Sequence, residues 1–66
     1  MMCILYLIND KKEKIEVFRH KYYNACIGQA KYLKNIKNMK GHFMIYEQIT
    51  EDKGCLHDIN TEILKI

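Results

Sequence analysis

Proline, serine and tryptophan do not occur in this sequence of 66 residues, and glycine and cysteine occur three times each. The lack of serine excludes a serine nucleophile, and the lack of proline excludes proline-rich recognition segments. A chain of this length is too short for two cores, so we expect residues 1–66 to fold as a single domain.

The three cysteines are Cys3, Cys26 and Cys55, an odd number at wide spacing with no Cys-x-x-Cys motif. A disulfide framework is therefore not expected, and we predict that Cys3 and Cys26 are buried thiols. The apolar run over residues 1–8 has no basic segment before it and no small-residue cleavage site after it, and it is far shorter than the roughly 20 residues of a membrane helix. We expect a cytoplasmic protein with no membrane partner.

The first half of the sequence predicts a β-hairpin followed by a helix. Residues 3–8 (CILYLI) are apolar at every position, which is typical of a strand inside a sheet, and residues 14–17 alternate, so Ile15 and Val17 should face the core. A helical period over residues 22–39 follows. Its apolar stripe consists of Tyr23, Cys26, Ile27, Ala30, Leu33 and Ile36.

Three further residues are expected to fix the ends and spacing of that helix. Gly28 lies inside it, and we attribute its presence to a close approach of helix and sheet. Asn38 and Gly41 are natural terminators, because glycine readily takes the left-handed conformation that closes a helix.

The second half of the sequence predicts another hairpin. Residues 43–49 have strand composition, residues 51–54 form a turn in which Gly54 takes a positive φ, and a fourth strand begins near Cys55. Residues 63–66 either continue this strand or form a helical turn capped by Asn60, and we favour the strand. The expected fold class is α+β: a four-stranded antiparallel sheet with one helix on one face, in the order β-β-α-β-β.

One helix can cover only one face of such a sheet. If Ile15, Val17 and either Phe43 or Ile45 face the helix, the opposite face is apolar and aromatic. Its expected residues are Ile4, Tyr6, Ile8, Phe18, Met44 and Tyr46. An apolar patch of this kind usually binds a partner, and so small a chain is marginally stable alone. We therefore expect a homodimer, with Tyr6, Met44 and Tyr46 as binding residues.

Charge is distributed unevenly along the chain, which has a formal net charge of +3. Lysines recur at every third position in Lys31, Lys34, Lys37 and Lys40. Together with nearby tyrosines they could bind the phosphates and bases of a nucleic acid, although the simpler interpretation is a solvated helix face. An acidic alternative follows in Glu47, Glu51, Asp52 and Asp58, which would suit a mimic of nucleic acid.

Catalytic and metal-binding motifs are weak. Cys55 and His57 share one strand face, and His42 or Cys3 could add zinc ligands, but the spacing matches no familiar zinc module. A small ribonuclease that uses His57 is a further alternative. No nucleotide-binding or zinc-protease motif occurs, so we expect neither enzymatic activity nor a cofactor.

Thirty residues are lysine, asparagine, isoleucine or tyrosine, which have A/T-rich codons. In size, composition and pattern, with an N-terminal hairpin, the helical segment 23–33 (YNACIGQAKYL) and a closing hairpin, the chain resembles small phage and mobile-element proteins that inhibit bacterial defence. The resemblance implies a non-enzymatic, homodimeric inhibitor that binds a host or defence protein. An RNA- or DNA-binding regulator that uses the lysine-rich helix is the alternative.

Overall fold

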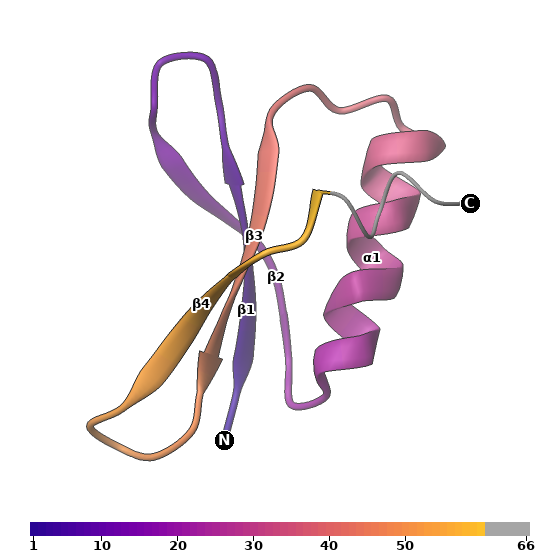
Figure 1. Cartoon of the computed structure of the whole chain (residues 1–66). Coiled ribbons are helices and arrows are strands. Elements are labelled where there is room, and N and C mark those ends of the chain that lie inside the picture. Colours follow the sequence, from indigo (N-terminus) through magenta and orange to yellow (C-terminus); the bar gives the residue numbers. More distant parts are fainter. Residues whose placement is uncertain (61–66) are drawn as a thin grey trace.

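The computed structural model describes residues 1–60, which contain two β-hairpins joined by a helix (Figure 1). The elements are β1 (Cys3–Ile8), β2 (Lys14–His20), α1 (Tyr23–Asn35), β3 (His42–Gln48) and β4 (Gly54–Asp58). The predicted fold class is confirmed: this is a small α+β fold with a four-stranded antiparallel sheet and one helix. The predicted tail strand over 63–66 lies outside the described residues.

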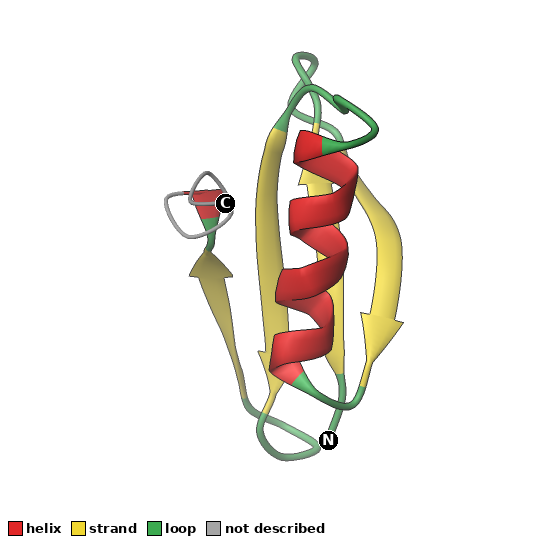
Figure 2. Ribbon diagram, turned by 90° about the vertical axis from the view of Figure 1, so that its right-hand side faces the viewer, coloured by secondary structure: helices red, strands yellow, loops and turns green. Residues whose placement is uncertain are grey.

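The strands lie in the order β2-β1-β3-β4, and each neighbouring pair is antiparallel. Helix α1 lies over β1, with β2 and β3 on either side of it, while β4 lies beyond the helix at the edge of the sheet (Figure 2). No helix among residues 1–60 is long and apolar enough to cross a membrane.

The core lies between α1 and the sheet, and alternation along the two central strands builds it. Leu5 of β1 and Phe43 and Ile45 of β3 are fully buried, and Cys26 and Ala30 of α1 pack against them. Cys3 and Cys26 are buried free thiols, as predicted, and burial raises the pKa of both. Both cysteines therefore behave as small apolar core residues.

Strand β2 continues to His20, beyond the predicted segment, and it contains a β-bulge. Leu5 lies opposite Phe18, whereas the next residue of β1, Tyr6, lies opposite Glu16. Val17 is the additional residue, so Val17 and Phe18 both pack against the core. The prediction that Phe18 lies on the face opposite the helix is therefore wrong, because strict alternation along the strand does not allow for an inserted residue.

Helix α1 ends at Asn35 and not at Met39, as the sequence pattern predicts. The amides of Ile36 and Lys37 both donate to the carbonyl of Tyr32, and Asn38 adopts a left-handed φ of 55°. Asparagine tolerates this conformation, and the turn directs Met39 back against the core. The placement of Ile36 on the apolar stripe is wrong, since it follows the last helical residue and is 66% exposed.

The close approach of backbone to neighbouring atoms occurs at Gly41 and not at Gly28. Gly28 is exposed, and a Cβ there would meet no atom within 4 Å, so the predicted contact between Gly28 and the sheet is wrong. Gly41 has a φ of 138° and precedes β3; a Cβ on it would lie 2.6 Å from Cδ1 of Leu7. Only glycine fits there without strain.

The second hairpin closes through residues 49–53, where the amides of Ile49 and Thr50 both donate to the carbonyl of Lys53. Gly54 is the first residue of β4 and does not have the predicted positive φ. At the other end of β4, the side chain of Asn60 donates to the carbonyl of Phe43 at 2.9 Å and accepts from the amide of Phe43 at 3.0 Å. The Asn60 amide thus continues the β3–β4 ladder by one further pair.

Candidate functional site

The side of the sheet away from α1, called the open face below, is the candidate site. Directly opposed residues of antiparallel strands share a side, so the register assigns each residue to a face. The open face consists of Ile4, Tyr6 and Ile8 of β1, Lys14, Glu16 and Arg19 of β2, His42, Met44, Tyr46 and Gln48 of β3, and Leu56 and Asp58 of β4. Neither a helix nor a strand of residues 1–60 lies over it (Figure 1).

The centre of the open face is apolar. Ile4 lies opposite Tyr46, and Tyr6 lies opposite Met44, so two aromatic and two aliphatic side chains alternate across β1 and β3. All four are partly exposed, and Leu56, which lies opposite Tyr46 on the next strand, is 50% exposed. This arrangement brings together Tyr6, Met44 and Tyr46, the three strand residues that the sequence predicts for binding.

Leu56 also belongs to this surface, although the sequence pattern does not predict it. It lies between Cys55 and His57, both of which point to the helix side because they oppose Glu47 and Ile45. The alternation of β4 was visible in the sequence, but its face depends on how β3 and β4 are paired. The five-residue connection over 49–53, longer than the predicted turn, sets that pairing.

Charged residues border the apolar centre on the β2 side. Nζ of Lys14 lies 4.7 Å from the centre of the Tyr6 ring, a cation–π contact. Arg19 donates from Nη2 and Nε to the two carboxylate oxygens of Glu16, at 2.7 and 2.8 Å. These bonds from Arg19 hold the pKa of the Glu16 carboxyl below its usual range. Glu16 and Arg19 therefore neutralise each other, whereas no described carboxylate pairs with Lys14.

On the β4 side the border is acidic. Asp58 accepts hydrogen bonds from the side chain and the backbone amide of Asn60, and Nε2 of His42 lies 2.9 Å from its Oδ2. These contacts, those of Asn60 foremost, lower the pKa of Asp58. Asp58 is thus a fixed carboxylate at one end of the open face.

The Tyr46 ring packs over a glycine on the neighbouring strand. A Cβ on Gly54 would overlap the hydroxyl end of the Tyr46 ring and lie 2.8 Å from the carbonyl oxygen of Glu47. The ring therefore covers the backbone of Gly54. A large aromatic side chain packed over an edge-strand glycine compensates for the side chain that glycine lacks.

Two of the four predicted lysines lie on α1, across the sheet from the open face, whereas Lys40 lies just before β3 and lines a hollow together with Ile8 and His42. Lys31 and Lys34 belong to α1, whereas Lys37 and Lys40 follow its end, so the four do not share one helix face. Two lysine–tyrosine contacts lie near α1. Nζ of Lys37 lies 5.8 Å from the ring centre of Tyr32, and Nζ of a further lysine, Lys21, lies 5.3 Å from the ring centre of Tyr22. Lysines and tyrosines thus meet around α1, separate from Tyr6, Met44 and Tyr46.

The predicted acidic residues do not form one surface. Glu47 faces the helix side, where Oε1 lies 3.1 Å from Nε2 of His57. Glu51 and Asp52 belong to the loop between β3 and β4, and Asp58 lies on the open face. A nucleic-acid mimic requires closely spaced carboxylates on one side, so this arrangement does not favour it.

The histidines and cysteines are also dispersed. Cys55 and His57 share the helix side of β4, as predicted, but His42 lies on the open face and Cys3 is buried. Among residues 1–60, no group of three or more His, Cys, Asp or Glu side chains could hold a metal ion. His57 packs edge-on against the Tyr23 ring at 5.3 Å between ring centres.

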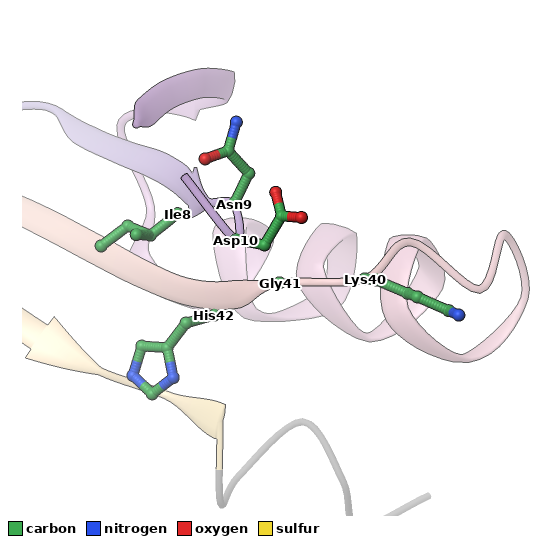
Figure 3. A pocket seen from close by; sticks show the side chains of 6 residues that line it. All are labelled: Ile8, Asn9, Asp10, Lys40, Gly41 and His42. Carbon is green, nitrogen blue, oxygen red and sulfur yellow. The ribbon is translucent and has the colours of Figure 1, made fainter. Parts of the chain in front are cut away.

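A cavity of about 500 Å³ lies where the β1–β2 connection meets the start of β3. Figure 3 shows that its lining side chains do not converge: Asn9 and Asp10 lie on one side of the chain, His42 lies on the other, and Lys40 extends away. A substrate site needs polar groups directed at a common point. The polar side chains of this cavity are not directed at a common point, so it does not have the geometry of a substrate site.

The chain matches no model of a known protein family, no curated protein and no solved structure.

Proposed function

We propose that this protein is a non-enzymatic protein-binding module that forms a homodimer through its open face. The observation that carries the proposal is the row of partly exposed apolar side chains across β1, β3 and β4: Ile4, Tyr6, Met44, Tyr46 and Leu56. Removing such a surface from water stabilises a complex by about 25 cal/mol per Å² of apolar area. A second copy supplies an identical apolar surface and shields both.

The arrangement of titratable groups supports a binding role over a catalytic one. The two histidine–carboxylate pairs, His42 with Asp58 and His57 with Glu47, lie on opposite sides of the sheet. They cannot act on one substrate. Each carboxylate lies within hydrogen-bonding distance of its histidine, and general acid–base catalysis needs a second group directed at the same point.

The mass of the protein in solution tests the dimer. Sedimentation equilibrium should give about 16 kDa, twice the chain mass of 7.9 kDa. Met44→Glu places a charge at the centre of the open face and should give the monomer mass. Tyr32→Glu makes a comparable change on α1, where the ring is 44% exposed, and should leave the dimer intact. A wild-type chain that stays monomeric at high concentration contradicts the proposal.

We also propose that the dimer binds a host or defence protein, which the resemblance to phage inhibitors implies. Expression of the chain in bacteria that carry defined defence systems, followed by phage challenge, tests this part. Plaque numbers should rise for one system with the wild-type chain and with Tyr32→Phe. The same numbers should not rise with Met44→Glu if the dimer is the active form.

A nucleic-acid-binding regulator is the second candidate, and one observation favours it. Tyr22 and Tyr32 are exposed beside Lys21 and Lys37, which is the combination of stacking ring and cation that binds single strands. The logarithm of affinity for a single-stranded oligonucleotide should then fall linearly with the logarithm of salt concentration. Lys37→Glu should weaken binding, whereas Met44→Glu should not. No retention at low salt would rule this candidate out.

A further inference from the structure

We infer that the two copies of the dimer are related by a two-fold axis that runs along the strands, an inference that rests on the proposed function. Because the sheet order is β2-β1-β3-β4, this axis sets β1 of each copy against β3 of its partner and β2 against β4. When two sheets pack face to face in the aligned arrangement, their strand directions differ by no more than about 30°. A two-fold axis along the strands is compatible with this arrangement.

The charges at the two edges of the open face support this axis. On that face β2 carries two cations and one carboxylate, Lys14, Arg19 and Glu16, and β4 carries the carboxylate of Asp58. Since Glu16 is bonded to Arg19 through both oxygens, Lys14 is the cation left to interact with another molecule. A cationic edge set against an anionic edge is electrostatically complementary.

The alternative two-fold axis that packs the two open faces together brings like charges close to each other. A two-fold axis across the strands sets β2 against the partner's β2 and β4 against the partner's β4. The two cationic edges would then face each other, and so would the two copies of Asp58. Like charges across an interface are unfavourable, so the edge charges select the axis along the strands.

Lys14 and Asp58 also lie at nearby positions along the strand direction, which an axis parallel to the strands leaves unchanged in the partner. Lys14 opposes Ile8, whereas Asp58 opposes Met44, which in turn opposes Tyr6. The two positions differ by two residues, or about 7 Å along the sheet. Packed sheets lie about 10 Å apart, and the side chains of Lys14 and of the partner's Asp58 both extend into this gap, so their charged ends can approach each other despite the offset.

Charge reversal tests the inferred axis. Lys14→Glu and Asp58→Lys should each weaken self-association on the order of tenfold, because two symmetric contacts become repulsive. In a mixture of the two variants both contacts of the heterodimer pair opposite charges. Native mass spectrometry should therefore show mostly heterodimer. Lys31→Glu, which makes the same charge change on α1, should leave the dissociation constant unchanged.

Each result has a distinct meaning. A monomeric wild-type chain removes the proposed function and the inferred axis with it. A wild-type dimer that becomes tighter with Lys14→Glu, or variants that form no preferred heterodimer, leaves the proposed function intact but overturns the axis. Because Asp58→Lys also removes contacts to Asn60, Asp58→Asn provides a milder second variant. It should weaken the dimer several-fold, and an unchanged or tighter dimer counts against the axis.

Discussion

The ring of Tyr46 occupies the space that a side chain at position 54 would need, so Tyr46 and Gly54 are fitted to each other. Gly54→Ala should lower the free energy of unfolding by about 1–3 kcal/mol, because the new methyl group overlaps the ring and approaches the Glu47 carbonyl. Urea denaturation followed by circular dichroism measures this change. A variant as stable as the wild type would mean that the ring moves aside freely.

Gly28→Ala is the matched substitution with the opposite expected sign. Gly28 lies in α1, is exposed, and has open space where a Cβ would be added. Alanine favours the helix over glycine by about 0.5–1 kcal/mol. The same denaturation experiment should therefore show a more stable protein, and a loss of stability would contradict the placement of Gly28 on the exposed side.

Asn60 holds the end of β4 against β3 through two bonds to the backbone of Phe43. Asn60→Ala leaves these partly buried groups without that partner and should cost about 1–3 kcal/mol of unfolding free energy. Amide exchange at Phe43 should become faster. Asn24→Ala, the same substitution on the exposed side of α1, should leave both quantities close to the wild-type values.

Acid should weaken the β4 end of the sheet. Hydrogen bonds from Asn60, together with His42, lower the pKa of Asp58 below its ordinary value of 3.8. The folded state then binds fewer protons than the unfolded state, so this stabilisation is present above pH 3.8 and is lost as pH falls through the lowered pKa.

Unfolding free energy measured against pH checks this expectation. Asp58→Asn should show a shallower loss of stability in acid than the wild type does. Glu16→Gln should remove the separate acid-sensitive part that comes from the bonds between Glu16 and Arg19. Equal slopes for the wild type and Asp58→Asn would argue against the Asp58 network.

The three thiols should differ in reactivity. Cys55 is exposed, whereas Cys3 and Cys26 are buried, and burial raises their pKa values. A low thiolate fraction and poor access both slow reaction with a disulfide reagent. The native protein should therefore release about one equivalent of the reagent's chromophore quickly and all three only in denaturant. Cys55→Ala should abolish the fast reaction.

Alternation and helical period were sufficient to predict the element order and the inner faces of the central strands. Leu5, Phe43 and Ile45 are buried as that pattern requires, because β1 and β3 each have a neighbour on both sides and neither strand contains the inserted residue of the bulge, which lies in β2. Phe18 could not be placed in this way. Its side depends on the bulge at Val17, which is a property of the pairing between two strands and leaves no mark in the sequence of one.

The glycines show a second limit of the sequence. Gly28 suggested a close helix–sheet contact, yet the positions that need a missing Cβ are Gly41, against Leu7, and Gly54, against Tyr46. Both contacts join residues far apart in the chain. The candidate surface was partly predictable. Alternation places Tyr6, Lys14 and Met44 on the face away from the helix, but the place of Leu56 on that face follows only from the pairing of β3 with β4.

Helix α1 and the open face lie on opposite sides of a single layer of strands (Figure 1). In a dimer closed through the sheets, the two helices therefore point outward in opposite directions. One rigid, compact molecule could not touch both helices of such a dimer, so the two helix surfaces would be available independently of each other. A filament or an oligomer with repeated sites would instead hold both ends, and the second contact would gain from the raised local concentration.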